Sequence, residues 1–448
     1  MKKIITISIV ILTIITVFSG CMEEQKPEPT KKTTKDLALE FMSTVLEENL
    51  SDAYNYFSPF MKNQFSYDQF EGTWIYIETT YGNFESIGDT SESVEDGYDI
   101  VFINCTFTDN YFIIFKIVFD ENKEISGFWT EKIDTINPYV PPEYVNISSF
   151  TEYEITIGSD PWILPATITI PNGEGLFPSV VLVHGSGAND KDETIGPNKP
   201  FKDIAWGLAS NGIIVLRYDK RTKVYPAETA GDKNLTVKEE FVDDAIEAVK
   251  LLQTYDEVDQ KRIYVLGHSL GAMMAPQIAT FEDGISGLIM LAAPARSLED
   301  LMYSQLVYLS ELDGVIDENE SLTINMILDA SEKIKTLNIS EDERVLSAYK
   351  AYWEYLNNYD QVETADNLEL PILLLQGKRD YQVTYEEDYT IWNNTLYDNN
   401  NVLMKTYDFL NHLFIAGEGP PTNTEYMTRG YVSEDVIKDM SIWINGEL

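Results

Sequence analysis

The pentapeptide Gly267-His-Ser-Leu-Gly271 is the stretch of this 448-residue chain whose residue types and spacing point most directly to chemistry. The apolar run Ile263–Leu266 before it is typical of a buried parallel strand, and the Gly/Ala/Met-rich segment after Leu270 is typical of a helix packed on a sheet. A serine on such a sharp strand-to-helix turn has a strained backbone and an exposed hydroxyl. Glycines two residues on either side let the two backbones approach closely. Ser269 is therefore the candidate nucleophile.

A serine hydroxyl is a weak nucleophile unless a base removes its proton, and the chain contains only three histidines. His268 adjoins the serine, from where its ring is poorly placed to turn back onto the hydroxyl. His184 begins His184-Gly-Ser-Gly187 at the end of a predicted strand, where main-chain amides are needed. His412 lies in the loop between the last predicted strand and the last predicted helix. Elimination leaves His412 as the candidate base.

The base needs a carboxylate that fixes its tautomer and stabilises its charged form. The apolar strand over 370–376 ends in a glycine turn that bears Asp380, which we favour over its competitors Asp219, Asp243 and Asp300. The order along the chain is then serine, aspartate, histidine. That order is the one found in α/β-hydrolases.

Negative charge that develops on a substrate carbonyl oxygen needs N–H donors aimed at it. The residue after the nucleophile, Leu270, is one expected donor. The second is expected from the loop after strand 179–184, where we choose Ser186 ahead of Gly187. The alternative is that this glycine-rich loop is a tight turn without a catalytic part.

Composition narrows the function further. The net charge of −42 argues against nucleic-acid binding, which needs basic patches. No phosphate-binding glycine motif follows a strand, residues 313–320 lack the spacing of a calcium-binding loop, and no His/Cys cluster could hold zinc. We therefore expect neither a cofactor nor a metal.

The first 20 residues combine a basic start, an apolar core and small residues, as in a signal peptide. Phe18-Ser-Gly-Cys21 resembles the prokaryotic lipoprotein box, which implies lipidation of Cys21 and a protein anchored to the outer face of the cytoplasmic membrane. A plain signal peptide or an uncleaved anchor are the alternatives. Residues 21–35 have the composition of a tether. Cys105, the other cysteine, is expected to be buried.

Two domains follow. Residues 36–136 are predicted to form a small α+β domain, with helices over 34–50 and 50–65 and three antiparallel strands over 98–107, 110–119 and 125–133. The aromatic residues Tyr98, Phe102, Phe107, Tyr111, Phe112 and Phe115 are expected to form its core, with a ligand pocket as the alternative. The proline-rich segment 137–149 is predicted to be a linker. Residues 150–448 alternate strands and helices, as in a mostly parallel sheet.

A long interruption separates two strands of this second domain. About 296–368 holds three helical stretches and is predicted to be a cap over the active site, with helices at the sheet edge as the alternative. Tyr349, Tyr352 and Trp353 are spaced to share one helical face. We expect this cap to select the acyl group of the substrate.

Residues 150–448 resemble the α/β-hydrolases of the bacterial esterase-D and serine-aminopeptidase-like group. The resemblance lies in Val181-Leu-Val-His-Gly-Ser-Gly187, Asp190-Lys-Asp-Glu193, Gly196-Pro-Asn-Lys-Pro-Phe201, Leu216-Arg-Tyr-Asp-Lys-Arg221, Gly267-His-Ser-Leu-Gly271, Gly377–Asp380 and His412. It implies a mostly parallel sheet with helices on both faces and a helical cap, and hydrolysis of small carboxylic esters without metal or cofactor. Residues 190–193, Asp219 and Arg221 are expected to form a charge network that fixes loops.

The small domain resembles, more distantly, a cone-like domain of unknown function found ahead of exported hydrolases. Two other functions stay open for the chain as a whole. One is a serine peptidase or amidase that uses the same triad, and the other is an inactive hydrolase fold that serves as a binding module. The sequence does not indicate an oligomeric state.

Overall fold

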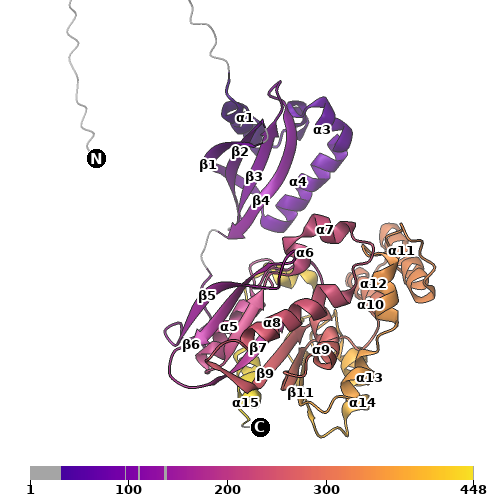
Figure 1. The fold of residues 1–448 in the computed structure, drawn as a ribbon. Helices are drawn as coiled ribbons and strands as arrows, with labels where there is room; N and C mark the ends of the chain where they lie inside the picture. Colours follow the sequence, from indigo (N-terminus) through magenta and orange to yellow (C-terminus); the bar gives the residue numbers. More distant parts are fainter. Residues whose placement is uncertain (1–31, 96, 109–110, 136–138, 447–448) are drawn as a thin grey trace, which may run out of the picture. The chain divides into compact units, whose positions relative to one another are not determined.

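The computed structural model describes residues 32–95, 97–108, 111–135 and 139–446 (Figure 1). Contacts within the chain divide it into two compact units, 1–137 and 138–448. The predicted signal peptide, Cys21 and most of the predicted tether lie outside the described residues. Among the residues that are described, no helix combines the length and apolar composition needed to cross a membrane.

The first unit packs its helices on one face of an antiparallel sheet, whose strand order is β1-β2-β3-β4. The helices described in it are α1 (Thr34–Leu46), α2 (Leu50–Ala53), the 3₁₀ turn η1 (Tyr54–Tyr56), α3 (Pro59–Gln64) and α4 (Tyr67–Tyr81). Its strands are β1 (Phe84–Glu95), β2 (Tyr98–Phe107), β3 (Tyr111–Phe119) and β4 (Ile125–Thr135). Burial alternates along β3, as expected for a strand with one face on a core.

Two elements of this unit differ from the sequence prediction. The sheet has a further strand, β1, which lies at its edge, pairs only with β2, and has a polar sequence without a clear apolar alternation. The helix α4 was not predicted either, because its aromatic and polar residues are mixed. Its start carries a local signal: the Ser66 side chain accepts from the Gln69 amide, and the Gln69 side chain accepts from the Ser66 amide.

The aromatic residues expected to form the core of this unit divide between the two faces of its sheet. Phe107, Tyr111 and Phe115 are buried, whereas Tyr98, Phe102 and Phe112 are not. The division follows the alternation of side chains along each strand, so that only one face meets the helices. Cys105 is buried, as predicted, and burial raises the pKa of its thiol.

Residues 139–446 form a mixed sheet in the order β12-β11-β10-β9-β7-β8-β6-β5. Its strands are β5 (Phe150–Ile157), β6 (Leu164–Pro171), β7 (Phe177–Val183), β8 (Ile214–Tyr218), β9 (Val258–His268), β10 (Gly287–Leu291), β11 (Ile372–Gly377) and β12 (Val402–Tyr407). The hairpin β5–β6 and the pair β6–β8 are antiparallel, and all the other pairs are parallel. The predicted fold class, an α/β sheet preceded by a small α+β unit, is confirmed.

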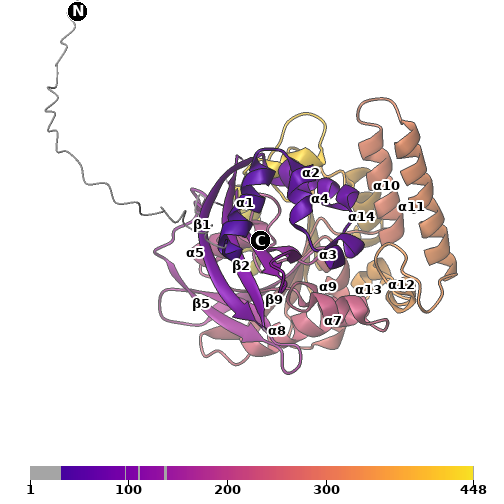
Figure 2. The same ribbon diagram turned by 90° about the horizontal axis from the view of Figure 1, so that it is seen from above.

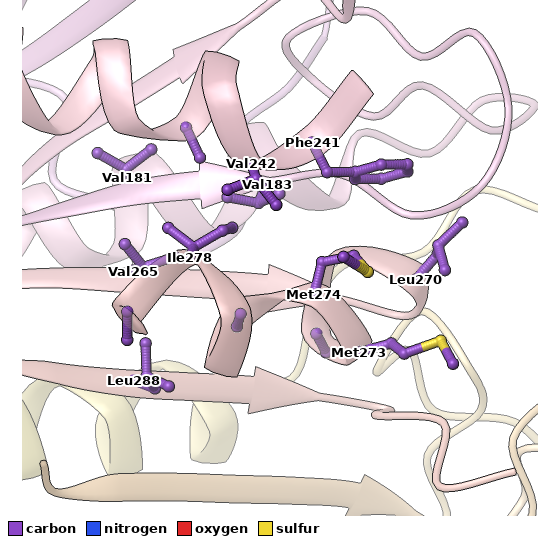
Figure 3. Packing of buried hydrophobic residues seen from close by; sticks show 14 of the residues in the cluster. Val181, Val183, Phe241, Val242, Val265, Leu270, Met273, Met274, Ile278 and Leu288 are labelled. Atoms are coloured by element: carbon purple, nitrogen blue, oxygen red, sulfur yellow. The ribbon is translucent and has the colours of Figure 1, made fainter. Parts of the chain in front are cut away.

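Each central strand sends alternate side chains into two separate cores. Val181 and Val183 belong to the core beneath α8 (Asp244–Leu252) and α9 (Leu270–Phe281), whereas Val180 and Leu182 belong to the core beneath α5 (Pro200–Ser210) and α15 (Glu434–Ile444). Figure 3 shows α9 in the first of these cores, with its methionines lying over the strands. Because both faces are covered, the strands are apolar throughout, as the sequence indicated.

The connection from β10 to β11 carries the helices of the predicted cap. They are α10 (Leu298–Ser310), α11 (Glu318–Thr336), α12 (Lys350–Asn357) and α13 (Gln361–Asp366), one more than the three stretches predicted. The first two form a hairpin that extends from the side of the unit (Figure 2). Shorter helical segments complete the unit: α6 (Arg221–Val224), α7 (Pro226–Gly231), η2 (Lys238–Asp243), η3 (Tyr385–Tyr389), α14 (Thr390–Leu396) and η4 (Asn423–Met427).

The segment predicted to be a linker is attached to the second unit over its described part, residues 139–149. The Tyr139 hydroxyl donates to Asp203, and the Tyr144 hydroxyl donates to the Val432 carbonyl at 2.8 Å. Burial raises the pKa of the Tyr144 phenol, which favours its role as a donor. Both tyrosines therefore fix the entry of the chain into the α/β unit.

Candidate active site

Ser269 lies on the turn between β9 and α9, with φ 53° and ψ −121°. A non-glycine residue in this conformation is strained, and such strain is typical of a nucleophile turn. The two flanking glycines are required by close backbone contact. A Cβ on Gly267 would lie 2.3 Å from the Gly271 carbonyl oxygen, and a Cβ on Gly271 would lie 2.3 Å from that of Val183. The backbone thus holds the serine above the end of the sheet, as the sequence predicted.

His412 lies in the loop after β12 and contacts the carboxylate predicted for it. Its Nδ1 is 2.7 Å from Asp380 Oδ2, and both side chains are buried. The other oxygen of Asp380 accepts from the main-chain amides of Gln382 at 2.8 Å and Val383 at 3.0 Å. These donors hold the carboxylate in one orientation behind the imidazole.

The three competing carboxylates have other partners. Asp219 accepts from the Lys191 amide, Asp243 pairs with Lys238, and Asp300 pairs with Lys335. Since each of them is engaged away from His412, the geometry favours Asp380.

Ser269, Leu270, Ser186 and His412 all line one cavity of about 810 Å³. Part of its wall comes from the cap: Leu298, Leu301, Met302 and Gln305 of α10, and Tyr349, Tyr352 and Trp353 at α12. Helices of the predicted cap thus contribute to the wall of the cavity, and the predicted aromatic face borders it. Trp353 is also a core residue, because it is 1% exposed and its indole donates to the Val345 carbonyl.

The loop that bears Ser186 is held by two buried charges. Glu193 belongs to the charge network expected from the sequence, whereas Lys220 was not assigned to it. The Gly185 amide donates to Glu193 Oε1 at 2.6 Å, and the Gly185 carbonyl accepts from Lys220 Nζ at 3.0 Å. Lys220 also pairs with Glu240 at 2.9 Å, and Glu240 accepts from the Tyr352 hydroxyl of the cap at 2.9 Å. This chain of contacts connects the loop to the cap.

The expected charge network is present around these residues. Asp192 pairs with Arg217 at 2.9 Å, and Arg221 forms a bidentate pair with Asp244 at 2.6 and 3.1 Å. Burial alone would raise the pKa of the Asp192 carboxyl, but the positive charges of Arg217, Lys199 and Lys202 together lower it to about 2. No group of His, Cys, Asp and Glu side chains within the described ranges is arranged to hold a metal ion.

Comparison with known proteins assigns the chain to a family. The family described as "Serine aminopeptidase, S33" matches residues 179–416. The curated "Esterase EstD" of Thermotoga maritima is 42% identical to this chain over 404 residues, which cover 90% of this chain and 93% of EstD. The chain belongs to the α/β-hydrolase esterase family. As a member of it, the protein is a carboxylic ester hydrolase.

Solved structures similar to this esterase include Est1E from Butyrivibrio proteoclasticus, at 17% identity and a TM-score of 0.42, covering 65% of this chain and 99% of that one. A hyperthermophilic esterase from Pyrobaculum calidifontis aligns at 15% identity and a TM-score of 0.44, covering 66% and 86%. The first unit of the esterase matches, over residues 38–128, a family described only as a protein of unknown function, DUF3887.

His184 of this esterase is not among the residues that line the cavity. Its ring packs against Phe201 and Tyr218, with centroid distances of 5.2 Å to each. Burial lowers the pKa of this imidazole to about 4. The residue is thus a neutral core histidine at the end of β7.

This histidine makes the stability of the esterase depend on pH. In the unfolded chain His184 takes up a proton near pH 6.5, whereas the folded ring does so only near pH 4. Protonation therefore favours the unfolded state, and the free energy of unfolding falls as pH decreases through that window. Between pH 7 and pH 5 we expect a loss of about 2 kcal/mol from this residue. His184→Phe keeps the ring and removes the titration. Urea unfolding of both proteins at the two pH values gives the free energies of unfolding. An equal change in this free energy between pH 7 and pH 5 in the two proteins would contradict the assignment.

Proposed function

We propose that Ser269, His412 and Asp380 form a catalytic triad that hydrolyses carboxylic esters through an acyl-enzyme. The observation that carries this proposal is the 2.7 Å contact of Asp380 with His412 Nδ1, beside a cavity whose wall includes the strained Ser269. Asp380 accepts the Nδ1–H of His412, which leaves Nε2 unprotonated and able to act as a base. The electrostatic support for the imidazolium is therefore in place before the substrate binds.

In the first step, Ser269 Oγ attacks the ester carbonyl while His412 Nε2 takes the hydroxyl proton. The carbonyl oxygen becomes an oxyanion, and the main-chain amides of Leu270 and Ser186 are its proposed hydrogen-bond donors. The intermediate then collapses, the C–O bond to the alcohol breaks, and His412 returns its proton to the leaving oxygen. A water molecule, deprotonated by His412, releases the acid by the same route.

The sequence leaves two other functions open. A binding module without activity does not fit a chain that belongs to an esterase family and retains all three residue types. An amidase or peptidase would use the same residues, so the triad does not distinguish it. We favour esters because the curated relative that shares 42% identity carries the name esterase.

Two measurements test this proposal. A fluorophosphonate probe should label the wild-type protein once, at Ser269. A panel of p-nitrophenyl esters and aminoacyl p-nitroanilides should then give higher kcat/KM for the esters. If the probe labels Ser269 but kcat/KM is higher for the anilides, the amidase is favoured. Absence of labelling would overturn the triad.

The cap is proposed to select the acyl chain, since α10 and α12 border the cavity that contains the nucleophile. Met302 of α10 lines this cavity and is only half-buried, so that a larger side chain there narrows the cavity. Met302→Trp should lower kcat/KM for octanoyl esters relative to acetyl esters by roughly tenfold or more, since a single methylene in an apolar pocket is already worth about tenfold.

The control for this variant is Tyr303→Trp, because Tyr303 is the next residue of α10 and is not among the residues that line the cavity. Its selectivity should match that of wild type. Equal changes in the two variants, or an unchanged ratio in Met302→Trp, would show that the cap does not select the acyl chain.

We also propose that the enzyme is tethered by a lipid on Cys21 at the outer face of the cytoplasmic membrane. The support is the sequence alone: an apolar run that ends in Phe18-Ser-Gly-Cys21, followed by a polar tether. Mass spectrometry of the mature N-terminus should find a lipidated Cys21. Retention of Met1, or cleavage that leaves Cys21 unmodified, would reject this anchoring.

A further inference from the structure

We propose that Glu193 and His268 are a positioning pair, which holds the oxyanion loop and the loop of the catalytic histidine in register with the nucleophile. This proposal rests on the triad and oxyanion residues assigned above. Neither residue is expected to exchange a proton with the substrate. Their contribution to catalysis is exerted through Gly185 and through the main chain of His412.

Glu193 uses both of its carboxylate oxygens. Oε1 accepts from the Gly185 amide at 2.6 Å, one residue before the proposed oxyanion donor Ser186. Oε2 lies 3.0 Å from His268 Nδ1, within the distance of an ion pair but not aligned as a hydrogen bond. The side chain is 1% exposed, so a carboxylate here needs both the hydrogen bond to Oε1 and a positive charge beside Oε2. The loop is thereby fixed by a charge-assisted hydrogen bond.

His268 extends this contact to the base. Its Nε2 lies 2.9 Å from the main-chain carbonyl of His412, and the two imidazole rings have centroids 4.7 Å apart. A carbonyl oxygen can only accept, and an ionised carboxylate can only accept. His268 Nε2 must then carry a proton. We infer a second proton on Nδ1, which makes the ring an imidazolium, because Nδ1 lies 3.0 Å from the carboxylate of Glu193. His268 precedes Ser269 in the chain, so one residue connects all three catalytic segments.

The electrostatics agree with this protonation. Burial opposes a charge on His268, but Glu193, the His412 carbonyl and Asp380 together outweigh it and raise the pKa of the imidazole. Burial likewise opposes ionisation of Glu193, and His268 outweighs it and lowers the pKa of that carboxyl. The other charged or titratable groups that act on the pair are Asp380 and His412 on one side, and His184 and Lys220 on the other.

The backbone of Glu193 gives independent support. Its φ is 50°, a left-handed conformation that costs a non-glycine residue about 1 kcal/mol or more. This loop therefore holds a strained residue whose side chain points inward to Gly185 and His268. A Cβ on Gly185 would lie 3.1 Å from Ser269 Cβ and 3.3 Å from Glu193 Oε1, so the three segments meet with little space to spare.

The test compares Glu193→Gln, His268→Gln and the double variant. Glu193→Gln keeps the shape and one acceptor but loses the charge, and should lower the rate constant of acylation by p-nitrophenyl acetate by about ten- to a hundredfold, with KM within about twofold. If the residues act as one unit, the double variant should lose no more than the worse single variant. Losses that multiply would overturn the pairing.

A matched control is Asp192→Asn, which neutralises the adjacent buried carboxylate that pairs with Arg217 and Lys199 rather than with the oxyanion loop. It should lower the melting temperature but leave the acylation rate per fluorophosphonate-labelled site unchanged. If Glu193→Gln behaves in the same way as this control, the pair is structural only and the proposal fails.

A second readout does not depend on catalysis. With only three histidines, a ¹⁵N-histidine NMR spectrum resolves each imidazole. At pH 7.5, without substrate, both nitrogens of His268 should be protonated, and Nδ1 should lose its proton in Glu193→Gln. A neutral His268 in the wild type would overturn the pair even if Ser269 is labelled. Failure of the triad would instead appear as absent labelling with a charged His268.

Discussion

Ser269→Ala is expected to lower kcat for p-nitrophenyl acetate by about 10⁶-fold, because no other group can form the acyl-enzyme. Ser269 lies on the strained turn at the cavity, and in the proposed mechanism its Oγ forms the covalent bond to the acyl group. Alanine removes that oxygen and keeps the Cβ, so the backbone at φ 53° is no more strained than before. Circular dichroism and the melting temperature should therefore match those of wild type.

The residual rate of this variant should come from substrate binding and from the oxyanion donors alone. The fluorophosphonate probe should no longer react, which separates loss of the nucleophile from loss of binding. Turnover close to that of wild type would show that a different residue attacks the ester.

Asp380→Asn is expected to lower kcat/KM by about 10⁴-fold, which is the second-largest effect. The carboxylate accepts the Nδ1–H of His412 at 2.7 Å and so leaves Nε2 free to receive the serine proton. An amide can instead donate its N–H to Nδ1, which places the imidazole proton on Nε2 and prevents it from acting as a base. The Gln382 and Val383 amides would still have an oxygen to donate to, so the loop should keep its conformation.

The matched control for this variant is Asp300→Asn. Asp300 was a competitor from the sequence but pairs with Lys335 on the cap, where exposed ion pairs contribute little. Its kcat/KM should stay within about twofold of wild type. If Asp380→Asn loses less than about tenfold, the carboxylate does not orient the base.

Local sequence patterns indicated two of the three proposed triad residues. Gly267 and Gly271 mark the turn, and the glycine turn after β11 marks Asp380. His412 followed from the small number of histidines rather than from any motif. The central strands of the second unit, such as β7, β10 and β11, were found to within a few residues because both of their faces are buried and their apolar runs are continuous.

The parts that the sequence did not predict depend on long-range contacts or on edge positions. Glu193 and His268 lie 75 residues apart, and nothing near either residue indicates that the other is its partner. Lys220 and Glu240 are likewise a pair formed by the fold, and their burial could not be seen from composition. The strand β1 was missed because an edge strand with one solvated face need not be apolar.

The insertion of the cap between two neighbouring strands has a consequence for how such enzymes can diversify. The cap is a single connection between β10 and β11, which pair in register from Leu288 opposite Ile372. Halving or doubling a flexible connection changes its closure entropy by only about 0.6 kcal/mol. The free energy of exchanging caps therefore lies in the apolar contacts of residues such as Trp353 and Leu356 with the core. A replacement that restores those contacts can present a different pocket wall to the same nucleophile, so that substrate range and chemistry can evolve separately.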